Sequence, residues 1–199
     1  MLIAGLDPSF TRTGISIYDT ERSFLFLDAV SKLESTEKTY QAMFNRVLLF
    51  GDRVVDALYS KGDLDTLISE EPLPTALFSS GLYTLDTHIF YRLIHDKGIN
   101  TIYNLHPTYC KYVKEAKKSI KSESVILAKE IIDTLKLNKV TVIQYTNRLN
   151  NDTAESFIFL FRLMVRNGII LPSGKNCKDL PMRRRFHEEK EKLLYTRSK

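Results

Sequence analysis

Apolar and polar residues follow two different periods along the chain, and together these periods predict a mixed α/β fold. Three short apolar or alternating runs come first, at residues 2–7, 15–18 and 24–30. Short polar turns separate them, which predicts an antiparallel meander of three strands. From residue 36 to 58 the apolar residues recur at three- and four-residue steps, as on a helix, and Gly62 is placed to end it.

Strands and helices then alternate to about residue 168. We expect strands at 64–69 and 99–105, helices at 82–95, 122–137 and 151–166, and a segment at 140–144 that could form a short strand. A meander followed by β-α alternation predicts an α/β fold with a mixed five-stranded sheet and helices on both faces. We expect residues 1–168 to form one domain and residues 169–199 to form a basic C-terminal extension.

Composition narrows the class of protein. The chain has 199 residues, with 43% hydrophobic and 27% charged residues, as in ordinary globular domains. No apolar stretch approaches the ~20 residues of a membrane-spanning helix. A signal peptide would require a basic region ahead of the first apolar run, and the sequence shows none there. Two cysteines are too few for a disulfide framework. We therefore expect a cytoplasmic protein with no membrane partner.

The positive and negative charges are unevenly distributed. Residues 1–100 carry 9 Lys and Arg against 14 Asp and Glu, whereas residues 101–150 and 175–199 each carry 9 against 4. An acidic half joined to two basic segments suits a metal-dependent centre flanked by a surface that binds a polyanion. Ordinary solvated surface would explain the same distribution, so the charges alone do not identify a binding site.

Acidic residues stand at three separate places where they could meet. Asp7 ends the first strand and Glu70 ends the fourth, with Glu71 as the alternative to Glu70. Asp152 and Glu155 lie three residues apart at a helix start and so share one helical face. Each has a structural explanation as well: a turn, a solvated strand end, or a capping box. The helix after Asp152 is apolar nearly all round, which predicts that it is buried and carries its acids inward.

Carboxylates gathered in one place repel one another unless cations neutralise them. Mg²⁺ and Mn²⁺ prefer oxygen ligands, and two such ions ~3.5–4 Å apart activate water for phosphoryl transfer. An Asp, a Glu and a D-x-x-E pair on separate elements are the ligands that such a centre requires.

These motifs resemble those of the RuvC family in order and spacing over residues 1–166. The matching stretches are Ile3-Ala4-Gly5-Leu6-Asp7-Pro8-Ser9 with Thr13-Gly14, then Leu67-Ile68-Ser69-Glu70, then Asp152-x-x-Glu155. RuvC proteins are homodimeric Holliday junction resolvases with a ribonuclease H-like fold. The resemblance implies that two Mg²⁺ or Mn²⁺ ions bind to the catalytic acids Asp7, Glu70, Asp152 and Glu155, with Asp7 between the ions. Long insertions suggest a bacteriophage-type member, acting in a bacterial or infected host cell.

The chain departs from the family pattern at two positions. The last acid is usually Asp, and the longer Glu155 could alter the spacing or preference of the metals. The family has an aromatic wedge three residues after the second acid, where this chain has Leu73; Phe78 is our candidate replacement, although packing beneath the loop would also explain it.

Basic residues predict where DNA would bind. A lysine-rich connector corresponds to a region that lies against DNA in the family, and an arginine run follows in the tail, which we expect to be mobile. A solvated face would explain the lysines as well. The candidates are Lys111, Lys114, Lys117, Lys118, Lys121, Arg183, Arg184 and Arg185.

We therefore expect a Mg²⁺- or Mn²⁺-dependent endonuclease that resolves Holliday junctions or other branched DNA in recombination and repair. One alternative is a binding module of the same fold that holds branched DNA without cutting it. Another is a different ribonuclease H-fold enzyme, acting on RNA–DNA hybrids or as a phosphotransferase. No nucleotide cofactor is expected, because Gly174-Lys175 lacks the preceding glycine-rich loop of a P-loop.

Overall fold

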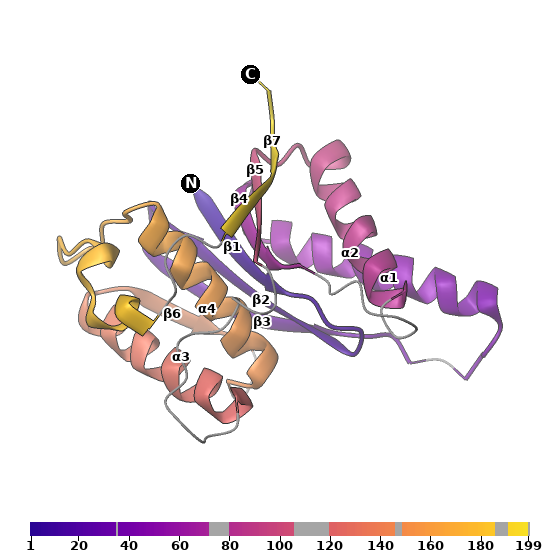
Figure 1. Cartoon of the computed structure of the whole chain (residues 1–199), viewed down its shortest axis with the longest axis horizontal. Helices are drawn as coiled ribbons and strands as arrows, with labels where there is room; N and C mark the ends of the chain where they lie inside the picture. Colours follow the sequence, from indigo (N-terminus) through magenta and orange to yellow (C-terminus); the bar gives the residue numbers. More distant parts are fainter. Residues whose placement is uncertain (35, 72–79, 106–119, 146–148, 186–190, 199) are drawn as a thin grey trace.

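The protein is a mixed sheet with α-helices on both faces (Figure 1). The computed structural model describes residues 1–34, 36–71, 80–105, 120–145, 149–185 and 191–198. Within these residues the strand order is β6-β3-β2-β1-β4-β5-β7. This confirms the predicted mixed α/β fold, with seven strands in place of the five expected.

The elements alternate along the chain much as the sequence predicted. The strands are β1 (Leu2–Asp7), β2 (Arg12–Asp19), β3 (Phe24–Ser31), β4 (Leu64–Glu70), β5 (Thr101–Leu105), β6 (Thr141–Gln144) and β7 (Glu191–Thr196). The helices are α1 (Tyr40–Tyr59), α2 (Ser80–Tyr91), α3 (Ile120–Leu137) and α4 (Asn151–Arg166). Three shorter helical segments are η1 (Arg92–Asp96), η2 (Cys177–Asp179) and η3 (Pro181–Arg185). The helix expected at 82–95 is therefore α2 followed by the π-helical η1.

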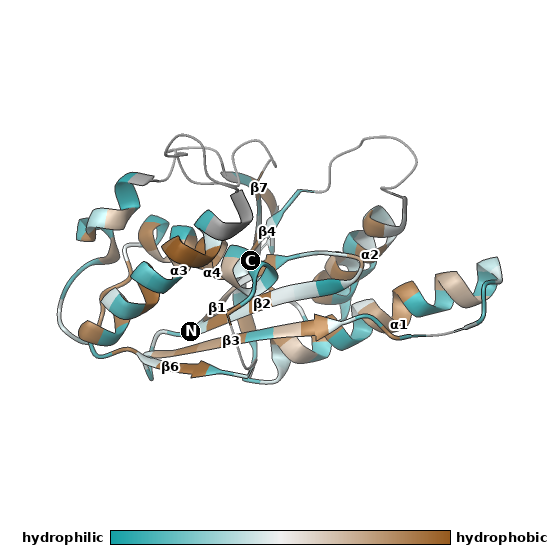
Figure 2. Cartoon of the chain, turned by 90° about the horizontal axis from the view of Figure 1, so that it is seen from below, coloured by the Kyte–Doolittle hydropathy of each residue, from teal (hydrophilic) through white to brown (hydrophobic). Residues whose placement is uncertain are grey.

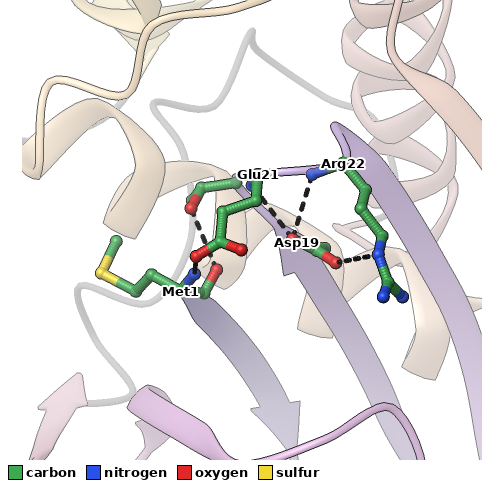
Figure 3. Close-up of polar contacts among 5 residues, drawn as sticks. Met1, Asp19, Glu21 and Arg22 are labelled. Carbon is green, nitrogen blue, oxygen red and sulfur yellow. Dashed lines mark hydrogen bonds and ion pairs between the residues drawn. The ribbon is translucent and has the colours of Figure 1, made fainter.

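The first three strands form the predicted antiparallel meander, and β4 pairs with β1 in parallel. The end of the meander opposite Asp7 is closed by polar contacts (Figure 3). The Met1 amino group lies 2.7 Å from Oε1 of Glu21. The backbone N–H groups of Glu21 and Arg22 donate to Oδ1 of Asp19 at 3.0 and 3.2 Å. These bonds hold the N-terminus against the β2–β3 turn, at the end of β1 opposite Asp7.

Each face of the sheet has its own apolar core. Ile3 packs with α3 and α4 on one face, while Ala4 and Leu6 pack with α1 and α2 on the other. Because successive strand residues point to opposite faces, Asp7 shares the face of Ile3. The strand β1 therefore presents its terminal carboxylate on the side that α4 covers.

The helix α4 is buried along most of its length, as its apolar sequence predicted. Two glycines let it lie directly against the sheet. A Cβ atom at Gly5 would lie 2.1 Å from the carbonyl oxygen of Ser156, and one at Gly14 would lie 2.1 Å from that of Asp152. Only a residue without a side chain allows the backbones of β1, β2 and α4 to approach this closely.

The helix α1 begins later than expected, and its start extends past the sheet. The Thr39 side chain caps it by accepting a hydrogen bond from the backbone N–H of Ala42 at 3.2 Å. The first turns project beyond the end of β3 (Figure 2), and Tyr40, Met43 and Phe44 are exposed there. The apolar period before Val47 therefore does not contribute to the core.

The strand β7 was not predicted. It pairs antiparallel with β5 at the edge of the sheet, and both Leu193 and Leu194 are exposed beside an irregularity in the pairing. Without one buried and one solvated face, the segment has no alternation that reveals a strand. Between α4 and β7, Leu171 and Leu180 join the core that contains α4. The domain division at residue 168 and the mobility of the tail stay predictions.

Candidate metal centre

The parallel pairing of β1 with β4 brings Asp7 and Glu70 together. The last paired residues of the two strands are Leu6 and Ser69. Asp7 and Glu70 come directly after them, so the two acids lie side by side at the strand ends. The first and fourth strands are thus parallel neighbours, and their carboxyl ends meet at one edge of the sheet. Asp7 is 7% exposed and Glu70 is half-buried.

Glu155 arrives from α4 at the same place. Its carboxylate joins those of Asp7 and Glu70 in a group whose ligand atoms all lie within 4.8 Å of one another. The helix α4 carries Glu155 and lies in close contact with β1 and β2 at their glycines. Three separate elements thus deliver one carboxylate each to a single point.

Neither acid of the D-x-x-E pair provides the helix cap. The N-cap of α4 is Asn150, whose side chain accepts a hydrogen bond from the backbone N–H of Thr153 at 2.9 Å. Asp152 lies inside the first turn, half-buried, and outside the group formed by Asp7, Glu70 and Glu155. The capping explanation for Glu155 is therefore wrong, and the role of Asp152 as a ligand stays a prediction.

Between the two candidates at the end of β4, Glu70 is the acid in the group. Adjacent residues of an extended chain point to opposite sides. The backbone N–H of Glu71 donates to the carbonyl of Leu105 at 2.8 Å, which continues the pairing with β5. Glu71 itself lies outside the group.

The helix α3 adds a hydrogen bond to the group. The hydroxyl of Ser124, which is fully buried, donates to Oε1 of Glu155 at 3.0 Å. No local pattern in the sequence indicates this residue, because a serine in a helix has no motif and the packing of α3 on α4 is a tertiary feature.

A further acid near the group, Asp86 on α2, was also missed. It is 2% exposed, and neither carboxyl oxygen has a hydrogen-bond partner among the described residues. Burial, together with the negative charge of Glu70, raises the pKa of Asp86 to about 8. A signal was present, since Asp86 lies beside Leu82, Leu85 and Ile89 on the apolar stripe of the predicted helix.

The donor set fits a hard divalent cation. It consists of carboxylate oxygens, which Mg²⁺ and Mn²⁺ prefer, and it contains no thiol or imidazole. The same oxygens would repel one another without a counter-charge. Asp7, Glu70 and Glu155 are thus the residues that could hold such an ion.

Most of the candidate DNA contacts fall outside the part of the chain that the structure describes. Phe78, Lys111, Lys114, Lys117 and Lys118 lie outside the described residues, as do the side chains of Lys121 and Arg185. Arg183 and Arg184 are exposed on η3.

In the described part of the chain, no helix is long and apolar enough to cross a membrane.

Known proteins resemble this chain in structure rather than in sequence. No protein-family model and no curated protein sequence matches it. RuvC from Thermus thermophilus superposes with a TM-score of 0.56 at 15% identity, over 85% of this chain and 98% of that chain. The T. thermophilus RuvC in complex with a Holliday junction substrate gives 0.53 at 13% identity, over 88% and 99%.

A third structure has the same architecture. The yeast mitochondrial Holliday junction resolvase Ydc2 gives a TM-score of 0.50 at 13% identity, over 79% of this chain and 75% of that chain. The chain therefore has the ribonuclease H-like fold of RuvC-like resolvases, which confirms the fold that its motifs predicted.

Proposed function

We propose that this chain, which has the fold of the RuvC-like resolvases, is a divalent-metal-dependent endonuclease that cuts branched DNA. Its preferred substrate is the four-way Holliday junction, and the cut leaves 5′-phosphate and 3′-hydroxyl ends. The observation that carries the proposal is the group of Asp7, Glu70 and Glu155, whose ligand atoms lie within 4.8 Å of one another although they come from β1, β4 and α4.

The three carboxylates would hold Mg²⁺ or Mn²⁺, with Asp152 as the fourth ligand residue. When bound, two such ions activate a water molecule and stabilise the charge that develops on the leaving oxygen. The protein's part is to hold the carboxylates rigidly. Asp7 is fixed at the end of a buried strand, and Glu155 is fixed by a buried helix and the Ser124 hydroxyl.

Cleavage of a synthetic four-way junction tests this function. We expect the wild type to cut in Mg²⁺ or Mn²⁺, and we expect Asp7→Asn to lose cleavage because it removes a negative ligand with little change of shape. Asp133→Asn is the matched control, since Asp133 is an exposed acid on α3 outside the group. Equal activity of the wild type and Asp7→Asn, or no cleavage with either metal, would refute the proposal.

The competing functions give different results in the same assay. A binding module would retain the junction in a gel-shift experiment and leave it uncut with every metal. A nuclease for hybrid duplexes would prefer an RNA–DNA hybrid when four-way junctions, flaps and hybrids compete. The acidic group favours cleavage over binding alone, because gathered carboxylates would repel a phosphate backbone in the absence of cations.

We further propose that the chain acts as a homodimer, because a four-way junction needs two symmetric cuts. By sequence, either of two apolar helices, at 82–95 or at 151–166, could supply the interface. The second, α4, has its apolar side chains buried within the chain. The first helix, which is α2 in the structure, remains the candidate for the interface. Its Tyr83 and Tyr91 are exposed around a shallow hollow of about 400 Å³ that Leu48 of α1 also lines.

Sedimentation velocity tests the dimer. We expect the wild type to be dimeric at micromolar concentration and Tyr83→Glu to be monomeric, because a charge would be buried at the contact. Ile126→Glu is the matched control, since Ile126 is similarly exposed but lies on α3, which covers the opposite face of the sheet. A wild type that remains monomeric would exclude the dimer.

For DNA contact we propose the lysine-rich connector, Phe78 and the arginine run. Each Lys or Arg that neutralises a phosphate should steepen the fall of affinity with salt. Replacing Arg183 and Arg184 together by alanine should weaken junction binding and reduce the salt slope by about 2. An unchanged slope would exclude these two side chains from the interface.

A further inference from the structure

The Ser124 hydroxyl makes a specific contact with one of the proposed ligands. Ser124 is fully buried in the first turns of α3, where α3 packs against α4. Its Oγ donates a hydrogen bond to Oε1 of Glu155 at 3.0 Å. A hydrogen bond to an ionised carboxylate is about twice as strong as one between neutral groups.

Glu155 needs such a restraint more than an aspartate would. Its side chain has one more rotatable bond than Asp, and fixing a flexible side chain costs conformational entropy. The neighbouring Asp7 and Glu70 carboxylates would also push a free carboxylate away from the group. A hydrogen-bond donor on Oε1 opposes both effects.

We propose that Ser124 is a positioning residue that holds the Glu155 carboxylate in place for a divalent cation. The inference rests on the proposed metal centre and names a residue that acts on it through Glu155. Groups that orient metal ligands in this way typically change metal affinity by about 10–100-fold when they are removed. The same loss is expected here.

Binding of Mn²⁺ to the metal-free protein, followed by calorimetry and by the EPR signal of free Mn²⁺, is the direct test. Ser124→Ala should weaken Mn²⁺ binding by about 10–100-fold. Ser156→Ala is the matched control: Ser156 is equally buried and adjacent to Glu155, but its hydroxyl donates to the carbonyl of Thr153 at 3.0 Å. The control should bind Mn²⁺ as the wild type does.

A double-mutant cycle separates positioning from general damage to the fold. In a Glu155→Gln background, Ser124→Ala should cause little further loss of Mn²⁺ affinity, because the carboxylate that it positions is already gone. Ser124→Cys, which keeps the size of the side chain but donates weakly, should give an intermediate affinity and covers the case in which the alanine variant fails to fold.

The outcomes distinguish this inference from the proposed function. If the wild type binds Mn²⁺ and both Ser124 variants bind it equally well, Ser124 does not position Glu155 although the metal centre stands. If Ser124→Ala loses as much affinity in the Glu155→Gln background as in the wild type, its effect is structural and the inference is wrong. If the wild type binds no Mn²⁺, the metal centre and the inference both fail.

Discussion

Replacing Gly5 by alanine should damage the metal centre without touching any carboxylate. A Cβ atom at this position would lie 2.1 Å from the carbonyl oxygen of Ser156 and 2.7 Å from the backbone nitrogen of Leu160. Both are atoms of the α4 backbone, so no side-chain rotation can relieve the overlap. To restore an ordinary contact of about 3.4 Å to the Ser156 oxygen, α4 must move by about 1.3 Å relative to β1.

Two consequences follow from this displacement. Overpacking of this kind costs about 1–3 kcal/mol of stability, partly offset by the roughly 0.5–1 kcal/mol that alanine gains over glycine in a strand. Glu155 moves with its helix, whereas Asp7 stays on β1. A misplacement of about 1 Å in a reacting geometry can cost about 100-fold in rate, so we expect a loss of that order in junction cleavage and a weaker affinity for Mn²⁺.

Urea unfolding and Mn²⁺ calorimetry measure the two effects separately. Gly174→Ala is the control, because Gly174 has a positive φ of 84° and no atom within 4 Å of an added Cβ. It should lose about 1–2 kcal/mol through backbone strain and keep the Mn²⁺ affinity of the wild type. A Gly5→Ala variant with unchanged stability and unchanged Mn²⁺ affinity would refute the claim that contact of α4 with β1 sets the site.

Three other predictions concern ionisable groups in or near the two cores. Glu155→Gln should be more stable than the wild type without metal and gain less from Mn²⁺, as measured by thermal unfolding; a loss of stability without metal would indicate a structural role. The pKa of Asp86 is raised to about 8 by burial and by Glu70, so the folded state binds this proton more tightly than the unfolded state, and its contribution to stability is lost as the pH rises from about 4 to 8. Urea unfolding should show that Asp86→Asn removes part of this loss, and identical pH profiles would contradict it. In a Cys110→Ser background, the Cys177 thiol, fully buried and with its pKa raised to about 12 by burial, should react with a thiol reagent at pH 8 far more slowly when folded than in urea; a fast reaction of the folded protein would contradict its burial.

The regular elements could be predicted because their periods are local. The helix α4 begins at Asn151 and ends at Arg166, as its apolar pattern and Gly168 indicated. Convergence of Asp7 and Glu70 required the first and fourth strands to be parallel neighbours, and the pairing of β1 with β4 meets this condition. The strand β7 was missed because Leu193 and Leu194 are both exposed and carry no periodic signal.

Within the site, the sequence identified acids but not the contacts that arrange them. Asp7, Glu70 and Glu155 were chosen from motifs, and the structure brings all three together. Ser124 and Asp86 depend on how α3 and α2 pack against other elements, which no local pattern specifies. The close approach of Gly5 to Ser156 likewise joins two elements that are distant in sequence, so it is visible only in the fold.

The arrangement of the three carboxylates itself argues for a bound cation. At 4.8 Å two unit charges repel by about 1 kcal/mol in water and by about 3 kcal/mol in a protein-like medium. The three carboxylates form three such pairs, and each pair adds a repulsion of this size. Helix capping does not account for the position of Glu155, because Asn150 caps α4. The Ser124 hydroxyl even holds Glu155 among the other two negative charges. A fold that fixes like charges together has its lowest free energy when a divalent cation neutralises them, so metal binding and the geometry of the site are expected to depend on one another.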